Sequence, residues 1–362
     1  MTIPIFDAHL DLAWNATSFN RDLTRSLLTI REAEAHCDDH PARGNAVISL
    51  PELKRAGLSF CVATLLARSG PERHNSTPTN RIDLDYADQT IASAVAQGQL
   101  AYYRILEQEG HLVLIKTKSD LLQHWERWQK ERDTTPPGII LSMEGTDPIM
   151  TPAHAGEWFK YGLRAAGIAH YGRSQHASGT ATSGSVTAAG KELLRCFEEQ
   201  GIALDVTHLC DQSMDEALSL FGGPVLASHH NCRSLVPGDR QITDRHIKQL
   251  VLRKGVIGLS LDCWMLEPGW RRDKPADVEV SLERAVDHID HMCQIAGSTK
   301  HVAIGSDLDG GFGNERTPLE LNAYADVQRL AEFLEKRNYS TADIELIFYG
   351  NWLRFFTEAL PD

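Results

Sequence analysis

Several features that would point to other classes of protein are missing from this sequence. No apolar run approaches the ~20 residues needed to cross a bilayer, and the N-terminus, MTIP, lacks the basic and apolar stretches of a secretory signal. The formal net charge of −13 argues against a nucleic-acid partner, which favours a basic surface. We therefore expect a cytoplasmic protein with no membrane and no nucleic-acid partner.

The seven cysteines are scattered, without any CxxC pair. Several fall inside apolar runs, so buried free thiols are favoured over a disulfide framework. The sequence also lacks a glycine-rich phosphate loop after its first apolar run, which argues against a doubly wound dinucleotide-binding sheet. What remains is the composition of an ordinary globular enzyme, with 42% hydrophobic and 23% charged residues in a chain of 362.

Short apolar runs recur along the chain, and most of them are followed by a stretch with helical periodicity. Runs without strict alternation are typical of strands covered on both faces, as in a parallel sheet. Eight such strands alternating with helices predict a (β/α)8 TIM barrel of the metal-dependent hydrolase type, forming a single domain over residues 1–362. The eight runs are 3–8, 58–66, 138–143, 163–169, 202–207, 224–228, 255–261 and 301–306.

Helices are expected between these runs. The segment 187–200 begins at a suitable N-cap threonine and ends before Gly201, and 211–220, 243–253 and 281–296 have comparable apolar spacing. A ninth apolar run, 111–115, is assigned to an insertion between the second and third barrel strands. The polar segment 67–85 is interpreted as a loop or lid over the barrel mouth.

Polar residues occupy the ends of many of these strands, where TIM barrels carry their chemistry. His9 and Asp11 are two residues apart, so they project to the same side of an extended strand. Any one of the sixteen histidines is more often a surface or core residue, but so many polar strand ends together indicate a site for divalent metal ions. The residues at these ends are His9, Asp11, Glu144, His170, His208, His229 and Asp307.

Several segments resemble the membrane (renal) dipeptidases and their bacterial relatives, over about residues 5 to 356. The resemblance implies a zinc-dependent barrel that hydrolyses dipeptides, some family members accepting a D-residue at the C-terminal position. The matching segments are 7–14 (DAHLDLAW), 143–145 (MEG), 204–208 (LDVTH), 228–233 (SHHNCR), 288–292 (HIDHM), 303–310 (AIGSDLDG) and 350–354 (GNWLR).

Carried over residue by residue, the resemblance implies two zinc ions per chain. His9 and Asp11 would hold one ion, and His208 and His229 the other, with Glu144 bridging. The substrate would be a small dipeptide-like molecule, and a homodimer is plausible from the family.

The same resemblance assigns the catalytic and substrate-binding roles. His170 would polarise the scissile carbonyl, Arg233 would grip the terminal carboxylate of the substrate, and Asp307 would shuttle the proton. From its spacing alone, Asp309, two residues on, could share the face of Asp307, which leaves open which of the two acts. Asp262 departs from the family pattern, because it stands where a substrate-contacting tyrosine is common. A carboxylate there would favour a cationic substrate group or change the shape of the pocket.

Two other functions fit the same residues. One is a different hydrolase on the same metal scaffold, a phosphoesterase or a lactonase, which would not need the carboxylate-binding arginine. The other is a non-catalytic binding protein that keeps the barrel, although retention of the full ligand set argues against it. The sequence leaves open whether the native metal is zinc, manganese or cobalt, and which substrate side chains are preferred.

Overall fold

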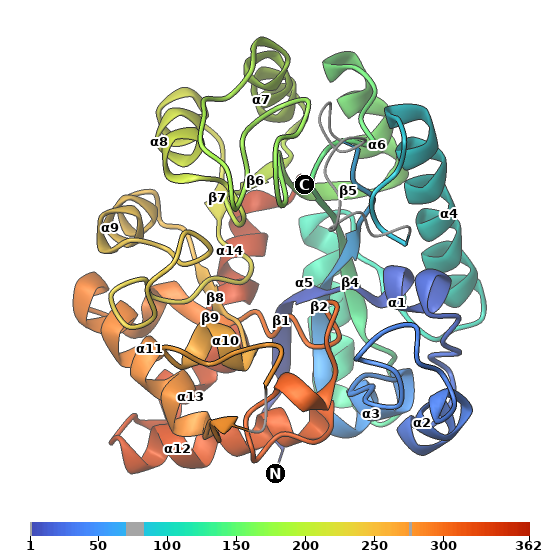
Figure 1. Cartoon of the computed structure of the whole chain (residues 1–362), viewed down its shortest axis with the longest axis vertical. Coiled ribbons are helices and arrows are strands. Elements are labelled where there is room, and N and C mark those ends of the chain that lie inside the picture. Colours follow the sequence, from blue (N-terminus) through green and yellow to red (C-terminus); the bar gives the residue numbers. More distant parts are fainter. Residues whose placement is uncertain (1, 70–82, 275–276) are drawn as a thin grey trace.

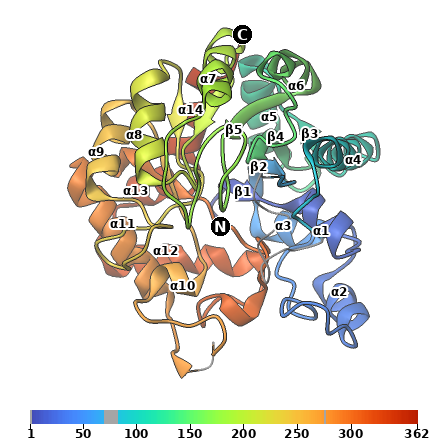
Figure 2. The ribbon, with the colours of Figure 1, turned by 45° about the horizontal axis from the view of Figure 1, so that its top comes forward.

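Short buried strands alternate with longer helices, and the strands curl into a parallel sheet with the helices around its outside (Figures 1 and 2). The computed structural model describes residues 2–69, 83–274 and 277–362. The strands are β1 (Ile5–Leu10), β2 (Leu58–Leu65), β3 (Val113–Leu114), β4 (Gly138–Glu144), β5 (Leu163–Gly167), β6 (Ala203–Asp205), β7 (Val225–Leu226), β8 (Ile257–Leu259) and β9 (Val302–Ile304).

Most of the helices lie around the outside of the sheet (Figure 1). They are α1 (Leu12–Ser18), α2 (Leu27–Glu34), α3 (Leu50–Ala56), α4 (Gln89–Gln108), α5 (Lys118–Lys130), α6 (Ala155–Tyr161), α7 (Ala188–Gln200), α8 (Asp211–Leu220), α9 (Asp244–Leu252), α10 (Cys263–Leu266), α11 (Leu282–Ala296), α12 (Leu330–Lys336), α13 (Thr341–Glu345) and α14 (Asn351–Ala359).

The strand order confirms the predicted barrel. The larger sheet runs β1-β2-β4-β5-β6-β7, and β8 pairs with β9. A parallel bridge between Ala227 and Ile257 joins β7 to β8. Asp7 of β1 then closes the ring, because one carboxylate oxygen accepts from the backbone N–H of Ser306 just after β9, at 2.9 Å, and the other accepts from the hydroxyl of Tyr324 at 2.8 Å. Apart from β3, which lies in the insertion, each strand thus neighbours the next in the chain, unlike in a doubly wound sheet.

The predicted insertion between the second and third barrel strands is present. It contains α4, β3 and α5, and β3 pairs in parallel with the first two residues of β4. Of the predicted loop 67–85, residues 70–82 lie outside the described part of the chain. Its two described ends are joined by Arg68 and Asp85, whose side chains form an ion pair with an N–O distance of 2.8 Å.

Local capping explains why the helices start where the sequence predicted. Thr187 caps α7 by accepting from the N–H of Gly190, and Gly201 ends that helix with a φ of 77°. Thr243 and Ser281 cap α9 and α11 in the same way. All four predicted helices are confirmed to within one residue at each end.

The N-terminal end of the barrel is closed by apolar packing. Trp352 of α14 is fully buried and donates its indole N–H to the carbonyl of Ile304 at 2.8 Å. Phe356 stacks on Phe6 of β1, with 5.5 Å between ring centroids. Aromatic side chains of this size bury much apolar surface, so this end of the barrel is a packed core and the polar chemistry is confined to the opposite end.

The cysteines agree with the sequence analysis. All seven are free thiols, and four of them are buried. No helix within the described ranges combines the length and the apolar character that spanning a membrane requires.

Gly258 of β8 provides a test of the barrel's closure. A Cβ there would overlap the carbonyl oxygen of Ser228, which lies beside the strand. We expect Gly258→Ala to lower the free energy of unfolding by about 1–3 kcal/mol, as overpacking does, measured by urea denaturation. Gly98→Ala is the matched control, because nothing lies within 4 Å of its Cβ position on the exposed side of α4. It should raise stability by up to about 1 kcal/mol. Equal stability of both variants would contradict this account.

Candidate active site

A β-bulge in β1 aims the first predicted ligand into the barrel. Asp7 pairs with Cys61 of β2 and Leu10 pairs with Ala63, so three residues of β1 span two of β2. The extra residue resets the alternation of side chains. His9 is thereby turned toward the barrel axis, where it is 2% exposed.

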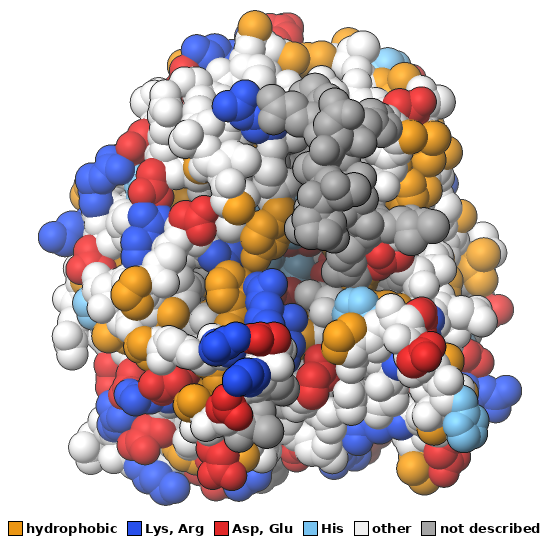
Figure 3. All heavy atoms as spheres, viewed as in Figure 1, with side chains coloured by type: hydrophobic (Ala, Val, Ile, Leu, Met, Phe, Trp, Pro, Cys, Tyr) orange, Lys and Arg blue, Asp and Glu red, His pale blue; other side chains and the backbone are white. Residues whose placement is uncertain are grey.

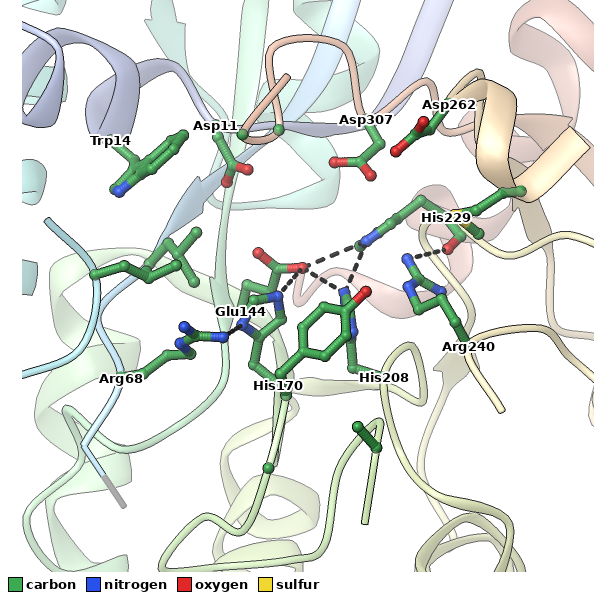
Figure 4. A pocket seen from close by; sticks show the side chains of 18 of the residues that line it. Asp11, Trp14, Arg68, Glu144, His170, His208, His229, Arg240, Asp262 and Asp307 are labelled. Carbon is green, nitrogen blue, oxygen red and sulfur yellow. Dashed lines mark hydrogen bonds and ion pairs between the residues drawn. The ribbon is translucent and has the colours of Figure 1, made fainter. Parts of the chain in front are cut away.

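Glu144, the last residue of β4, lies at the centre of the predicted constellation (Figure 4). Its Oε1 atom is 3.0 Å from Nε2 of His208, 3.3 Å from His229, 3.6 Å from His170 and 3.7 Å from His9. These histidines come from the C-terminal ends of four different strands. The structure therefore brings the five predicted residues together around one carboxylate oxygen.

Two further carboxylates surround His9. Its Nε2 lies 3.6 Å from Oδ2 of Asp11 and 3.8 Å from Oδ1 of Asp307. Asp307 follows β9 with a φ of 59°, a left-handed backbone that is uncommon for a residue with a side chain. Gly310 makes room for its carboxylate, because a Cβ at that position would overlap Oδ1 of Asp307. The two carboxylates and His9 form a second group that could hold a metal ion.

Two of the histidines have hydroxyl partners that suit the tautomer a metal ligand needs. Nδ1 of His208 lies 3.2 Å from the hydroxyl of Thr180, and Nδ1 of His229 lies 2.8 Å from the hydroxyl of Ser228. With Nδ1–H donating to the hydroxyl, the Nε2 lone pair is directed into the site. Burial lowers the pKa of both histidines well below the usual value, so both rings are neutral.

The donor atoms at the centre of the site have the chemistry of metal ligands. The two Nε2 atoms of His208 and His229 face each other at 3.2 Å. Nε2 of His9 is buried without a hydrogen-bond partner in the described structure. Facing lone pairs, an unpartnered imidazole nitrogen and clustered carboxylates are the donor set of zinc and similar ions. The residues present therefore fit a metal centre.

The pKa values of Glu144, Asp307 and His9 reflect the carboxylates that are clustered here. Burial raises the pKa of Glu144 to about 8 and that of Asp307 to about 7, and the neighbouring carboxylate of Asp11 adds to both shifts. Burial lowers the pKa of His9, but the attraction of Glu144, Asp11 and Asp307 outweighs it and raises the value to about 10.

His170 differs from the other histidines. A guanidinium nitrogen of Arg68 lies 3.1 Å from its Nδ1 (Figure 4). A guanidinium can only donate, so this Nδ1 accepts and the neutral ring carries its proton on Nε2. His170 therefore presents an N–H to the centre of the site, where the ligand histidines present a lone pair.

The cluster opens into a cavity of about 550 Å³, visible as a hollow near the middle of the face in Figure 3. In Figure 4, Trp14 and Arg68 lie on one side of the cavity and Arg240 and Asp262 lie on the other. Such a volume and mixed lining are typical of a small-molecule site.

Arg233 does not reach the cavity, contrary to its predicted role. Its guanidinium makes two hydrogen bonds with the carboxylate of Asp211, at 2.6 and 2.7 Å, and its Nε donates to the carbonyl of Gln241. These contacts engage most of the donors of Arg233, which lies in the loop after β7. Arg240, seven residues further along the same loop, does line the cavity.

Arg240 is a cavity-lining residue that the sequence analysis missed. It is 2% exposed, and one terminal nitrogen donates to the carbonyl of His229 at 3.0 Å. The other terminal nitrogen, Nη1, is buried with no hydrogen-bond partner in the described ranges. The only sequence signal was an arginine in the loop segment VPGDR, and Arg233 stood closer to the His229 motif.

Asp262 lines the cavity as expected, but its charge is already engaged. It forms an ion pair with Arg316, with Nε at 3.2 Å from Oδ1, and its side chain caps α10 by accepting from the N–H of Trp264. A carboxylate held in this way is not available to a cationic substrate group. The ion pair therefore changes the shape of the pocket more than its net charge.

Asp309 is turned away from the cavity. Its carboxylate accepts from the backbone N–H groups of Val47 and Ile48 at 3.0–3.2 Å and lies 3.6 Å from Arg21. Burial raises its pKa to about 6. This side chain anchors the turn that carries Asp307, and it does not share the face of Asp307.

Relatives with known sequence match parts of the chain. An uncharacterized protein encoded in the pqqA 5′ region of Klebsiella pneumoniae is 30% identical over 173 residues, which is 48% of this chain and 60% of that protein. The chain spans 37–60% of the length of three of the curated relatives that it matches.

Solved structures match the whole fold. The dipeptidase AC, a metallopeptidase of family M19, has a TM-score of 0.79 at 20% identity, with 100% of both chains covered. A metallopeptidase from Rhodobacter sphaeroides, solved with a phosphinate mimic of the dipeptide L-Ala-D-Ala, has a TM-score of 0.77 at 20% identity and covers 99% of this chain and 100% of its own. Both share the barrel described above.

The family comparison extends over nearly the entire sequence. The membrane dipeptidase family, peptidase family M19, matches residues 1–360. This match includes every strand end that contributes to the cluster around Glu144. The chain therefore belongs to the membrane dipeptidase family of metallopeptidases.

Proposed function

We propose that this protein is a zinc-dependent dipeptidase with two metal ions per chain. His9 and Asp11 would hold one ion and His208 and His229 the other, with Glu144 bridging. The observation that carries the proposal is the set of four imidazole Nε2 atoms within 3.0–3.7 Å of one oxygen of Glu144. A carboxylate with two oxygens at such a junction is suited to bridging a pair of ions.

Bound zinc ions would supply Lewis acidity, which polarises a carbonyl and lowers the pKa of water toward neutrality. The side chains around them would carry the rest of the reaction. Asp307 would take the proton of the attacking water and deliver it to the leaving amine, which is otherwise a poor leaving group. His170 would donate its Nε2–H to the oxyanion that develops on the scissile carbonyl.

Arg240 would bind the terminal carboxylate of the dipeptide. Its Nη1 group is buried without a partner among the residues that the structure describes, which costs free energy until an acceptor arrives. A carboxylate is the acceptor best matched to a guanidinium in geometry and charge. This assigns to Arg240 the role that the sequence analysis gave to Arg233.

The relatives support the finer features of the proposal. The Rhodobacter sphaeroides metallopeptidase was solved with a mimic of L-Ala-D-Ala, which supports tolerance of a D-residue at the C-terminal position. The seven unpaired cysteines support a reducing compartment, the cytoplasm, as the location.

Removal of the bridging carboxylate should remove the metal. We expect purified Glu144→Ala to retain well under half of the zinc found in the parent protein, measured by inductively coupled plasma mass spectrometry, because both ions lose a shared ligand. Glu126→Ala, on the exposed side of α5, is the control and should keep its full content. Unchanged zinc in Glu144→Ala would exclude the bridge.

The proton shuttle should be separable from metal binding. Asp307→Asn keeps the size of the side chain but removes the base, so we expect kcat for dipeptides to fall roughly 10²-fold or more while the bound zinc is retained. Steady-state kinetics on metal-loaded protein would measure this. Full activity of the variant would show that another group moves the proton.

The two arginines of the loop after β7 should behave differently. Arg240→Gln should lower kcat/KM for dipeptides by about 100-fold, because a buried charge-assisted pair is lost. Arg233→Gln should change kcat/KM little, since its partner Asp211 is partly exposed. For a dipeptide amide, which lacks the carboxylate, the parent enzyme and Arg240→Gln should have similar values of kcat/KM. A phosphoesterase or lactonase would show none of these differences.

A further inference from the structure

One side of the cavity is rich in guanidinium groups. Arg240, Arg272 and Arg316 line it, together with Trp264. In Figure 3, Lys and Arg side chains gather beside the central hollow. A dipeptidase needs one of these cations for the terminal carboxylate, so the others require a separate explanation.

The carboxylates that line the cavity do not neutralise this side. Arg316 is paired with Asp262, and on the opposite side Arg68 is paired with Asp85. The remaining acidic lining residues, those near His9, belong to the proposed metal centre. Arg240 and Arg272 have no carboxylate partner among the residues that the structure describes. Two cations therefore face the cavity with their charge available.

Arg272 is an exposed residue that stacks on an aromatic side chain. Its guanidinium carbon lies 3.9 Å from the ring centroid of Trp264, which is stacking distance for a cation on an indole. Trp264 belongs to α10, whose start is capped by Asp262. Stacking occupies the flat face of the guanidinium and leaves its N–H edges able to donate.

Arg240 and Trp264 lie on segments that are joined directly. Gln241, next to Arg240, donates from its side chain to the carbonyl of Met265 in α10 at 2.7 Å. Figure 4 shows Arg240 and Asp262 on the same side of the cavity. A substrate residue whose α-carboxylate lies at Arg240 would thus have its side chain next to the wall formed by α10.

A dipeptide with neutral side chains carries only one carboxylate. In the proposed function, on which this inference rests, that group is bound by Arg240, which leaves Arg272 without an acceptor. We infer that Arg272, stacked on Trp264, selects dipeptides whose C-terminal residue has a carboxylate side chain, Asp or Glu. The pairing of Asp262 with Arg316 prevents the same wall from attracting a cationic side chain.

The test compares isosteric substrates. With zinc-loaded enzyme, kcat/KM is measured for Ala-Glu and Ala-Gln, each with L and D configuration at the C-terminal residue. We expect the parent enzyme to prefer the Glu substrate at least tenfold in the configuration it accepts. Arg272→Gln should reduce this ratio to near one. Arg272→Glu should reverse the preference, so that Ala-Lys is cleaved faster than Ala-Glu.

Arg271→Gln is the matched control. Arg271 is adjacent and exposed, but it is paired with Asp273 and does not line the cavity. Its variant should keep the parent ratio. A parent enzyme that cleaves Ala-Gln as well as Ala-Glu, or a ratio that survives in Arg272→Gln, would overturn the inference alone. Failure of the zinc-loaded enzyme to cleave any dipeptide would overturn the proposed function, and the inference with it.

Discussion

The interaction on which the site depends is the contact of one carboxylate oxygen of Glu144 with four imidazole nitrogens. A buried carboxylate is costly unless positive charge balances it, and burial raises its pKa to about 8. The imidazoles come from separate strands, so they converge only when the barrel is closed. Barrel closure and metal-site assembly are therefore one event, and loss of either would disturb the other.

Local strain at the strand ends gives the site its shape. The bulge in β1 turns His9 inward, and His208 and Asp307 have φ values of 68° and 59°. Left-handed backbone at residues with side chains costs of order 1–3 kcal/mol each. The packed end around Trp352 and the anchoring of Asp309 provide the rigidity that keeps these conformations in place. The packed end of the barrel thus provides the stability, and the strand ends that form the site carry the backbone strain.

Hydrogen-bond partners decide the role of each polar side chain. His170 is a donor because Arg68 occupies its Nδ1, whereas His208 has a hydroxyl there and offers a lone pair. The guanidinium of Arg233 is hydrogen-bonded to Asp211. Arg240 lines the cavity, and one of its terminal nitrogens has no hydrogen-bond partner among the described residues. Residues of one type therefore have different chemistry because their hydrogen-bond partners differ.

The sequence by itself determined the barrel, the helix starts at capping residues such as Thr187, and the residues that gather at the strand ends. These depend on periodicity and local hydrogen bonds, which a sequence displays. Only the tertiary structure decided that Arg240 enters the cavity, that Asp309 turns away from it, and that Asp262 is neutralised by Arg316. The physical reason is that a side chain's direction and charge state depend on partners tens to hundreds of residues away, such as the N–H of Ile48, 261 residues from Asp309.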